Sequence, residues 1–258
     1  MHTIRNYIMA ESLEQAWELN QKGRNNIIIG GNLWLKMGRR NIINAIDLSS
    51  LGLDKIEEDE GGFRIGCMAT LHDIETHEGL NKEFQNLFKE AVRHIVGVQF
   101  RNCATIGGSI FPKLGFSDVL TAFLACDTQV ILYKKGEVPL REFIYIPTDN
   151  DILTHLYVKK DGRKTAYESF RMTETDFPTI TCAMAKTQDG FETVLGARPK
   201  HAEVVVDEVV ADAFSSEEVA DYAKRVIGKL QYGSNIRGSE QYRKQLSRVL
   251  TGCRATRL

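Results

Sequence analysis

Along the first 52 residues, apolar positions are spaced as in a small α/β unit. Ser12 followed by Gln15 is a capping-box pattern, which predicts the start of an amphipathic helix. The β-branched run Ile27–Ile29 predicts a buried strand that stops at paired glycines. A helical turn over residues 33–37 and a second strand through residues 42–48 are expected next. Together these elements predict a first unit over residues 1–52.

A second, larger unit is expected over residues 53–149. An acidic stretch over residues 53–62 indicates an exposed hairpin connection, and strand Phe63–Ile65 follows it. Phe84–Val96 has apolar side chains at helical spacing, which predicts one long amphipathic helix. The other elements expected here are a helix capped by Thr70, a helix over Asp118–Ala125 capped by Ser117, and a strand over Thr128–Tyr133.

From about residue 150 the pattern changes to short strand-like runs. Asp161-Gly162 and Asp189-Gly190 lie between such runs and indicate hairpins. The expected strands cover Leu153–Val158, Thr165–Phe170, Thr179–Ala185 and Phe191–Leu195, and helices Ser216–Leu230 and Ser239–Leu250 close the chain. We therefore expect an α+β fold whose third unit, residues 150–258, has an antiparallel sheet.

Composition narrows the classes of function. The chain has 258 residues with 33 Lys+Arg and 34 Asp+Glu, so its net charge is 33 − 34 = −1, without the basic excess of a nucleic-acid binder. No apolar run approaches the roughly 18 residues of a membrane span, and the first residues show no secretory signal. We expect a cytoplasmic protein that binds no nucleic acid and has no membrane span.

The five cysteines do not form a metal-binding pattern. The closest pair, Cys103 and Cys126, is 126 − 103 = 23 positions apart, and no Cys/His cluster has ligand spacing. No Ser/His/Asp or Cys/His arrangement supports nucleophilic catalysis, and Cys103 is expected to be a small buried side chain. Redox chemistry in this chain would therefore need an organic cofactor or a metal on a partner.

Two glycine-containing segments are candidate anion sites. The first comprises Ile28, Ile29, Gly30, Gly31, Asn32 and Leu33, and the second comprises Thr105, Gly107, Gly108 and Ser109. Glycines let backbone N–H groups approach a phosphate, and a helix N-terminus adds partial positive charge. A Gly-Gly pair after a strand is also an ordinary tight turn, so two loops that converge are more informative than either one. Neither segment is the GxGxxG of a Rossmann site or a P-loop.

Two further polar positions each keep two interpretations. Asp118, which follows Ser117, is either a first-turn helix carboxylate or an acceptor for a ribose hydroxyl. Arg101 either caps a helix or contacts a phosphate.

These segments resemble those of a known family in their order and spacing. They are Ile29–Leu33, Ile65–Leu71, Gln99–Ile110 and Ser117-Asp118 with Leu124-Ala125, together with the closing segments Leu195–Pro199 and Ile236–Arg243. They are similar to the FAD-binding subunit of molybdenum hydroxylases, a family that includes xanthine dehydrogenase and the carbon monoxide dehydrogenase medium chain. The resemblance covers nearly the whole chain.

The resemblance implies a fold, a cofactor and partners. Two α/β subdomains of the vanillyl-alcohol-oxidase-like type, residues 1–52 and 53–149, would hold FAD between them, and residues 150–258 would cover one side. Both glycine segments would contact the FAD pyrophosphate and neighbouring groups, with Asp118 toward the ribose. The implied partners are a molybdopterin-binding large subunit and a small subunit with two-iron, two-sulfur clusters, and NAD is one implied acceptor.

The chain also departs from the family pattern. Ser109 stands where relatives often have Asn, and Asn32 where they have a small or hydroxylic residue. Phe111–Phe116 is bulky where relatives have small residues, and Thr179 stands where some eukaryotic members carry a lysine near the flavin. An FAD-binding redox subunit is the first hypothesis. An assembly module of the same fold that has lost FAD is the second, and a stand-alone flavin oxidase is the third.

Overall fold

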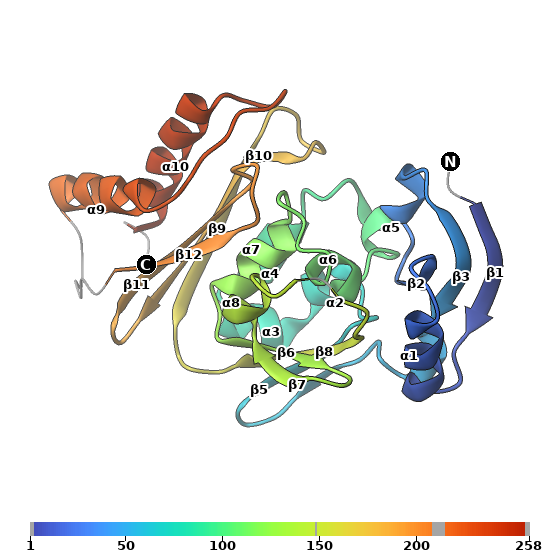
Figure 1. Ribbon diagram of the computed structural model, residues 1–258. Helices are drawn as coiled ribbons and strands as arrows, with labels where there is room; N and C mark the ends of the chain where they lie inside the picture. Colours follow the sequence, from blue (N-terminus) through green and yellow to red (C-terminus); the bar gives the residue numbers. More distant parts are fainter. Residues whose placement is uncertain (1–2, 148, 208–214, 256–258) are drawn as a thin grey trace.

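The structure is a computed structural model, and it describes residues 3–147, 149–207 and 215–255. Three sheets follow one another along the molecule, and helices lie between and beside them (Figure 1). The largest hydrophobic core runs through all three regions, because it includes Ala16 near the N-terminus, Phe88 in the middle and Val194 near the C-terminus. The fold is a mixed α+β fold with one parallel and two antiparallel sheets.

The first unit is a three-stranded parallel sheet with one long helix. Its elements are β1 (Thr3–Met9), α1 (Leu13–Gln21), β2 (Asn26–Ile29), the 3-10 turn η1 (Leu35–Met37), β3 (Asn41–Asp47) and the 3-10 turn η2 (Ser49–Leu51), with the strand order β1-β3-β2. Ser12 caps α1 as predicted, since its side chain accepts a hydrogen bond from the Gln15 N–H at 3.1 Å. Strand β1 was not predicted. It is an edge strand with mostly exposed side chains, so the sequence lacks the alternation of a half-buried strand.

The second unit has a five-stranded antiparallel sheet in the order β4-β5-β8-β6-β7. Its strands are β4 (Ile56–Glu58), β5 (Gly62–Gly66), β6 (Thr128–Leu132), β7 (Gly136–Pro139) and β8 (Leu153–Lys159). Its helices are α2 (Leu71–Thr76), α3 (Glu78–Glu83), α4 (Leu87–Val92), α5 (Val98–Arg101), α6 (Ile106–Ile110), α7 (Asp118–Leu124) and α8 (Leu140–Phe143). The predicted hairpin over residues 53–62 and the Thr70 cap of α2 are confirmed.

Two sequence-based expectations for this region are wrong. The helix predicted over Phe84–Val96 is shortened to α4, because Gln85 and Asn86 adopt positive φ angles of 47° and 62° before it and Val96 one of 51° after it. The second concerns β8, which falls within the predicted third unit but hydrogen-bonds to β5 and β6 in the second sheet. Asp161-Gly162 therefore connects two sheets rather than closing a hairpin.

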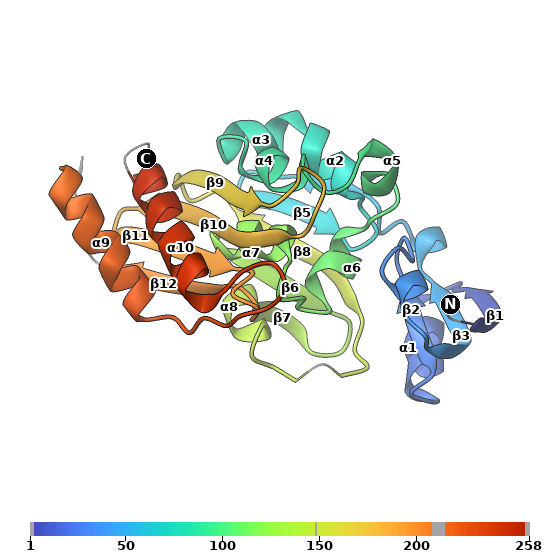
Figure 2. The same ribbon diagram turned by 90° about the horizontal axis from the view of Figure 1, so that it is seen from above.

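The third unit has a four-stranded antiparallel sheet in the order β12-β11-β10-β9. Its elements are β9 (Lys164–Arg171), β10 (Pro178–Thr187), β11 (Gly190–Gly196), β12 (Glu203–Asp207), α9 (Ser216–Gly228) and α10 (Glu240–Ala255). The hairpin predicted at Asp189-Gly190 joins β10 to β11. Helices α9 and α10 lie on one side of this sheet, and α4 and α7 of the second unit lie on the other (Figures 1 and 2).

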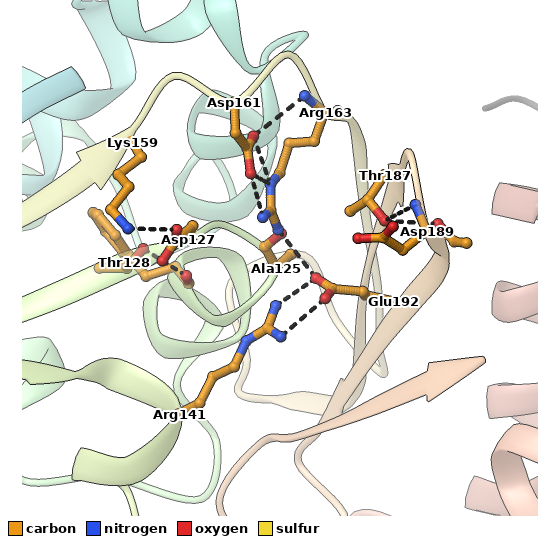
Figure 3. A network of polar contacts seen from close by, with 12 residues as sticks. Ala125, Asp127, Thr128, Arg141, Lys159, Asp161, Arg163, Thr187, Asp189 and Glu192 are labelled. Atoms are coloured by element: carbon orange, nitrogen blue, oxygen red, sulfur yellow. Dashed lines mark hydrogen bonds and ion pairs between the residues drawn. The ribbon is translucent and has the colours of Figure 1, made fainter. Parts of the chain in front are cut away.

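A charge network with a largely buried centre, Arg163 and Glu192, joins the second unit to the third (Figure 3). The Arg163 guanidinium donates hydrogen bonds to Asp161, to Glu192 of β11 at 3.1 Å and to the Ala125 carbonyl at the end of α7 at 2.6 Å. Arg141 of α8 donates to Glu192 from the opposite side at 2.9 Å. Burial works to raise the pKa of Asp161, but the hydrogen bonds and charge of Arg163 outweigh it and lower that pKa. The network therefore holds the end of α7 against the third sheet.

We predict that Arg163→Met lowers the free energy of unfolding by about 3 kcal/mol. The variant leaves the largely buried Glu192 with one cation instead of two, and the Ala125 carbonyl loses its hydrogen-bond donor. Urea unfolding checks this value. The matched control is Lys159→Met, which removes the exposed Lys159–Asp127 pair drawn in the same figure and is expected to cost less than about 1 kcal/mol. An equal decrease in the free energy of unfolding of the two variants would contradict a stabilising role for the Arg163–Glu192 contact.

Candidate functional site

The first glycine segment lies directly against the second unit. It begins where β2 ends, and a Cβ atom placed on Gly31 would lie 1.6 Å from the Cys103 carbonyl oxygen. A Cβ on Gly30 would lie 2.2 Å from Oγ1 of Thr105. Only glycine fits such close backbone approach. The two segments predicted to converge therefore meet, and the paired glycines are what allows it.

The same segment presents unused polar groups. Within the described part of the chain, the N–H groups of Gly31, Asn32 and Leu33 donate to no other residue. Asn32 has a left-handed φ of 55°, which Asn tolerates better than most residues. Its side-chain Oδ1 is buried and has no hydrogen-bond partner among the described residues. Buried polar atoms are normally paired, so this orphaned amide indicates a missing ligand or water.

The second segment is not a loop as expected, because it forms the start of α6. Thr105 is the N-cap, and its Oγ1 accepts a hydrogen bond from the Gly108 N–H at 3.2 Å. The Gly107 N–H donates to the Cys67 carbonyl at 2.8 Å, and Ser109 Oγ donates to the Thr105 carbonyl at 2.9 Å. These groups are therefore already bonded within the protein, and they mainly fix the wall against which Gly30 and Gly31 lie.

Ser117 and Asp118 begin α7, as the sequence predicted. Ser117 Oγ accepts from the Leu120 N–H at 3.0 Å and donates to the Ser109 carbonyl at 3.2 Å. Asp118 is buried, and its Oδ1 accepts from the Tyr167 hydroxyl and from Arg171 Nη2, each at 2.5 Å. Burial raises the pKa of Asp118, and the nearby Arg171 charge opposes that rise.

Tyr167 and Arg171 were missed by sequence reasoning. They lie 49 and 53 residues beyond Asp118, and the only local signal is that both occupy one face of strand β9. Their contacts link the start of α7 to the third unit. Asp118 is thus a structural carboxylate in the described residues, and a contact with a ribose stays a prediction.

The Arg101 side chain stabilises the fold. It is almost completely buried and donates to both Glu75 oxygens, with Nε–Oε2 at 2.7 Å and Nη2–Oε1 at 3.0 Å. This bidentate pair fixes α5 to α2, and α5 leads directly into the Cys103 carbonyl that contacts Gly31. Its Nη1 also donates to the Ile95 carbonyl, beyond the end of α4, at 3.3 Å, so all three nitrogens bond within the protein and a contact with a phosphate stays a prediction.

The structure also bears on the cysteines, on metal sites and on surface hollows. Cys103 has an exposed side chain, contrary to the expected buried one, because its carbonyl rather than its thiol faces Gly31. Among the described residues, no three His, Cys, Asp or Glu side chains gather as a metal site, and no helix is long and apolar enough to cross a membrane. Two surface hollows of about 620 and 530 Å³ lie along α2–α4 and between α4 and β9, and neither is lined by a glycine segment.

Comparison with known proteins identifies the family. Residues 2–158, more than half of the chain, match the family model of the FAD binding domain in molybdopterin dehydrogenase. The chain belongs to this family. It is therefore an FAD-binding protein of the molybdopterin dehydrogenase type, as the sequence motifs indicated.

Individual relatives of this FAD-binding family agree over nearly the full length. The chain is 26% identical to the glyceraldehyde dehydrogenase medium chain of Sulfolobus acidocaldarius, with 95% of each chain covered. It is 25% identical to 6-hydroxypseudooxynicotine dehydrogenase complex subunit alpha of Paenarthrobacter nicotinovorans, covering 95% of this chain and 90% of that protein. Carbon monoxide dehydrogenase of Hydrogenophaga pseudoflava contains a chain of the same fold, with a TM-score of 0.87, 21% identity and coverage of 97% and 96%.

The first glycine segment fits the FAD of this family. A pyrophosphate needs several hydrogen-bond donors close together, and the unused N–H groups of residues 31–33 provide them. The buried amide of Asn32 is available to a further polar group of the cofactor. The second segment contributes the rigid wall formed by Cys103 and Thr105.

We predict that Glu75→Gln lowers the free energy of unfolding by about 2 kcal/mol at pH 7, because it leaves Arg101 buried without its carboxylate. Burial works to raise the pKa of Glu75, but Arg101 and His72 lower it overall. A lowered folded-state pKa gives stability that is full above the unfolded value of about 4.3 and is lost as pH falls through the folded value. Urea midpoints should therefore converge for the two proteins in acid.

The exposed Glu90–Arg93 pair provides the control for this measurement. Glu90→Gln is expected to change stability by less than about 1 kcal/mol at every pH. A difference between wild type and Glu75→Gln that stays constant into acid would contradict the ionic origin of the effect.

Proposed function

We propose that this chain is the FAD-carrying subunit of a multi-subunit molybdopterin-dependent dehydrogenase of the xanthine dehydrogenase type. Electrons from iron–sulfur clusters on a small partner subunit, released by oxidation of a substrate at a molybdopterin-binding large subunit, would reach NAD or another acceptor through this chain. The observation that carries the proposal is the contact of Gly30 and Gly31 with residues 103–105, beside unused N–H groups, inside a matched FAD-binding domain.

The printed names of the relatives support the multi-subunit part of the proposal. One is a medium chain and another is a subunit of a dehydrogenase complex, and this chain aligns with almost all of each.

The residues of this chain would bind FAD, orient it and enclose it. Gly31, Asn32 and Leu33 would donate backbone N–H groups to the pyrophosphate, with Ile28 and Ile29 holding the loop in the core. Thr105, Gly107, Gly108, Ser109 and Ser117 would keep the opposing wall rigid through the hydrogen bonds described above. FAD, when bound, supplies the electron chemistry, so no acid–base residue of this chain is needed for it.

We also infer a separate role for each of the three parts of the chain. Residues 1–52 and 53–149 would form the two vanillyl-alcohol-oxidase-like subdomains around FAD, with residues 150–258 as the covering domain. Strand pairing favours adding β8 to the second subdomain, because it lies between β5 and β6. Asp118, bound by Tyr167 and Arg171, then stands where the covering domain meets the FAD-binding part.

The bulky stretch that motivated an assembly module without FAD has defined places in the fold. Phe111 packs against the main core, with its ring 6.0 Å from that of Phe143. Phe116 contacts Trp34 and Phe177 instead, at 5.4 and 4.4 Å between ring centroids. Both side chains are thus accommodated by packing on neighbouring aromatic rings.

We predict that the purified chain, alone or in its complex, carries FAD with absorption bands near about 370 and 450 nm. Gly31→Ala should abolish FAD retention, because the added Cβ would collide with the Cys103 carbonyl and move the loop. The control is Gly23→Ala, where no atom lies within 4 Å of the added carbon. Visible spectra measure the flavin content of wild type and the two variants, and circular dichroism shows whether each is folded.

A folded Gly31→Ala protein with full flavin content would contradict the site. A wild-type protein that binds no FAD under any condition would favour the assembly module. A flavin-loaded monomer that oxidises a substrate without molybdenum or iron–sulfur partners would favour the stand-alone oxidase.

A further inference from the structure

Four aromatic rings from three parts of the chain meet in one cluster, which we call the aromatic junction: Trp34, Phe100, Phe116 and Phe177. Trp34 lies 5.0 Å from Phe177 and 6.1 Å from Phe100 between ring centroids. Phe116 and Phe177 are 4.4 Å apart. The contact between Trp34 and Phe177 joins the first unit directly to the third.

Three of the four junction residues are close in sequence to residues assigned to the FAD site or its wall. Trp34 follows Leu33, the last residue of the first glycine segment. Phe116 precedes Ser117 and Asp118. Phe100 lies on α5, three residues before the Cys103 carbonyl that contacts Gly31. Movement of the rings would therefore be transmitted to the loops that bind the cofactor.

Phe177 comes from the connection between β9 and β10, and a partly exposed ion pair fixes it there. Asp176 Oδ1 accepts from Arg237 Nη2 at 3.0 Å and from the Phe177 N–H at 2.7 Å. The Arg237 guanidinium also lies over the Phe177 ring, 4.7 Å from its centroid. Arg237 thus contacts both the Asp176 carboxylate and the face of the ring, a cation–π arrangement, while Arg171 Nη1 donates to the Asp176 carbonyl at 2.7 Å.

Arg237 itself is held by the closing segment Ile236–Arg243 that the sequence analysis singled out. The Arg237 N–H donates to Asn235 Oδ1 at 2.9 Å, and Asn235 and Gly238 pair as a short bridge. Arg243, whose side chain is fully buried, donates to the carbonyls of Thr179 and Gly233 and to Asn235 Oδ1. The loop that presents Arg237 is therefore anchored to the start of β10.

We propose that Arg237 and Asp176 are positioning residues that hold Phe177 against Trp34 and so keep the third unit closed over the FAD site. The inference rests on the proposed function for the identity of the ligand, but the contact exists without it. Because the Arg237 and Asp176 side chains are 27% and 30% exposed, removing the pair should open the junction without unfolding the domain.

The first measurement needs no cofactor. Trp17 and Trp34 are the only tryptophans, so Trp17→Phe leaves Trp34 as a single fluorescent reporter. In that background and without FAD, Arg237→Ala is expected to shift Trp34 emission to the red and to increase its quenching by acrylamide. Arg237→Lys keeps the positive charge but loses the planar guanidinium. Its Trp34 emission and acrylamide quenching should lie between those of wild type and Arg237→Ala.

The second measurement uses FAD in the full chain. Arg237→Ala should speed FAD release about tenfold, which corresponds to the loss of an exposed ion pair and one cation–π contact. Asp176→Asn should also speed FAD release. The double variant, with both Arg237→Ala and Asp176→Asn, should release FAD no faster than Arg237→Ala alone. Raising the salt concentration should speed release from wild type and leave Arg237→Ala nearly unchanged.

The matched control is Arg225→Ala, which removes the Arg225–Asp207 pair at 3.0 Å in the same domain, away from the junction. It should leave Trp34 quenching and FAD release as in wild type. Unchanged Trp34 quenching in Arg237→Ala, or an equal change in Arg225→Ala, would overturn the proposal. If wild type binds no FAD, the proposed function fails, while the fluorescence comparison still decides whether Arg237 holds the junction.

Discussion

The candidate site depends on one contact between two stretches of backbone, Gly31 against the Cys103 carbonyl. No side chain fits between them, since even a Cβ atom would lie 1.6 Å from the oxygen. One partner is fixed by β2, which runs into the parallel sheet of the first unit. The other is fixed by α5, through the bidentate Arg101–Glu75 pair, and by α6. The position of the unused N–H groups therefore follows from the packing of two units, and neither unit makes the site alone.

Buried arginines organise the third unit in a comparable way. Arg198 is fully buried and donates to the carbonyls of Leu195, Gln231 and His201, with Glu203 at 3.1 Å as counter-charge. Arg243 binds carbonyls in place of any carboxylate. An arginine carries five donors in a rigid fork, so one side chain can satisfy several loop carbonyls at once. This explains why the irregular segments near residues 197–202 and 231–239, which overlap the closing segments recognised in the sequence, keep defined shapes.

Local signals in the sequence predicted the elements that local interactions determine. Ser12, Thr70 and Ser117 cap helices where expected, because a cap needs only residues three positions apart. Long-range pairing was beyond such reasoning: β8 joins the second sheet, although its sequence resembles the strands that follow it. The glycine segments were identified correctly as meeting, and the N–H groups of Gly107 and Gly108 bond to Cys67 and Thr105 within the protein, while their contact with FAD stays a prediction. The partners of Asp118 could not be foreseen, since nothing near Asp118 in the sequence points to β9.

Among the polar contacts that connect the third unit to the rest, the Arg163 network and the Arg237–Asp176 pair differ in how much of each is exposed to solvent. The centre of the Arg163 network, Arg163 with Glu192, is largely buried and joins the end of α7 to β11. The Arg237–Asp176 pair is partly exposed and acts only on the connection that carries Phe177. A buried charge is costly to leave unpaired, whereas an exposed pair is worth little to global stability. The buried centre of the Arg163 network and the partly exposed Arg237–Asp176 pair should therefore contribute very differently to stability, and loss of the second would leave the fold intact.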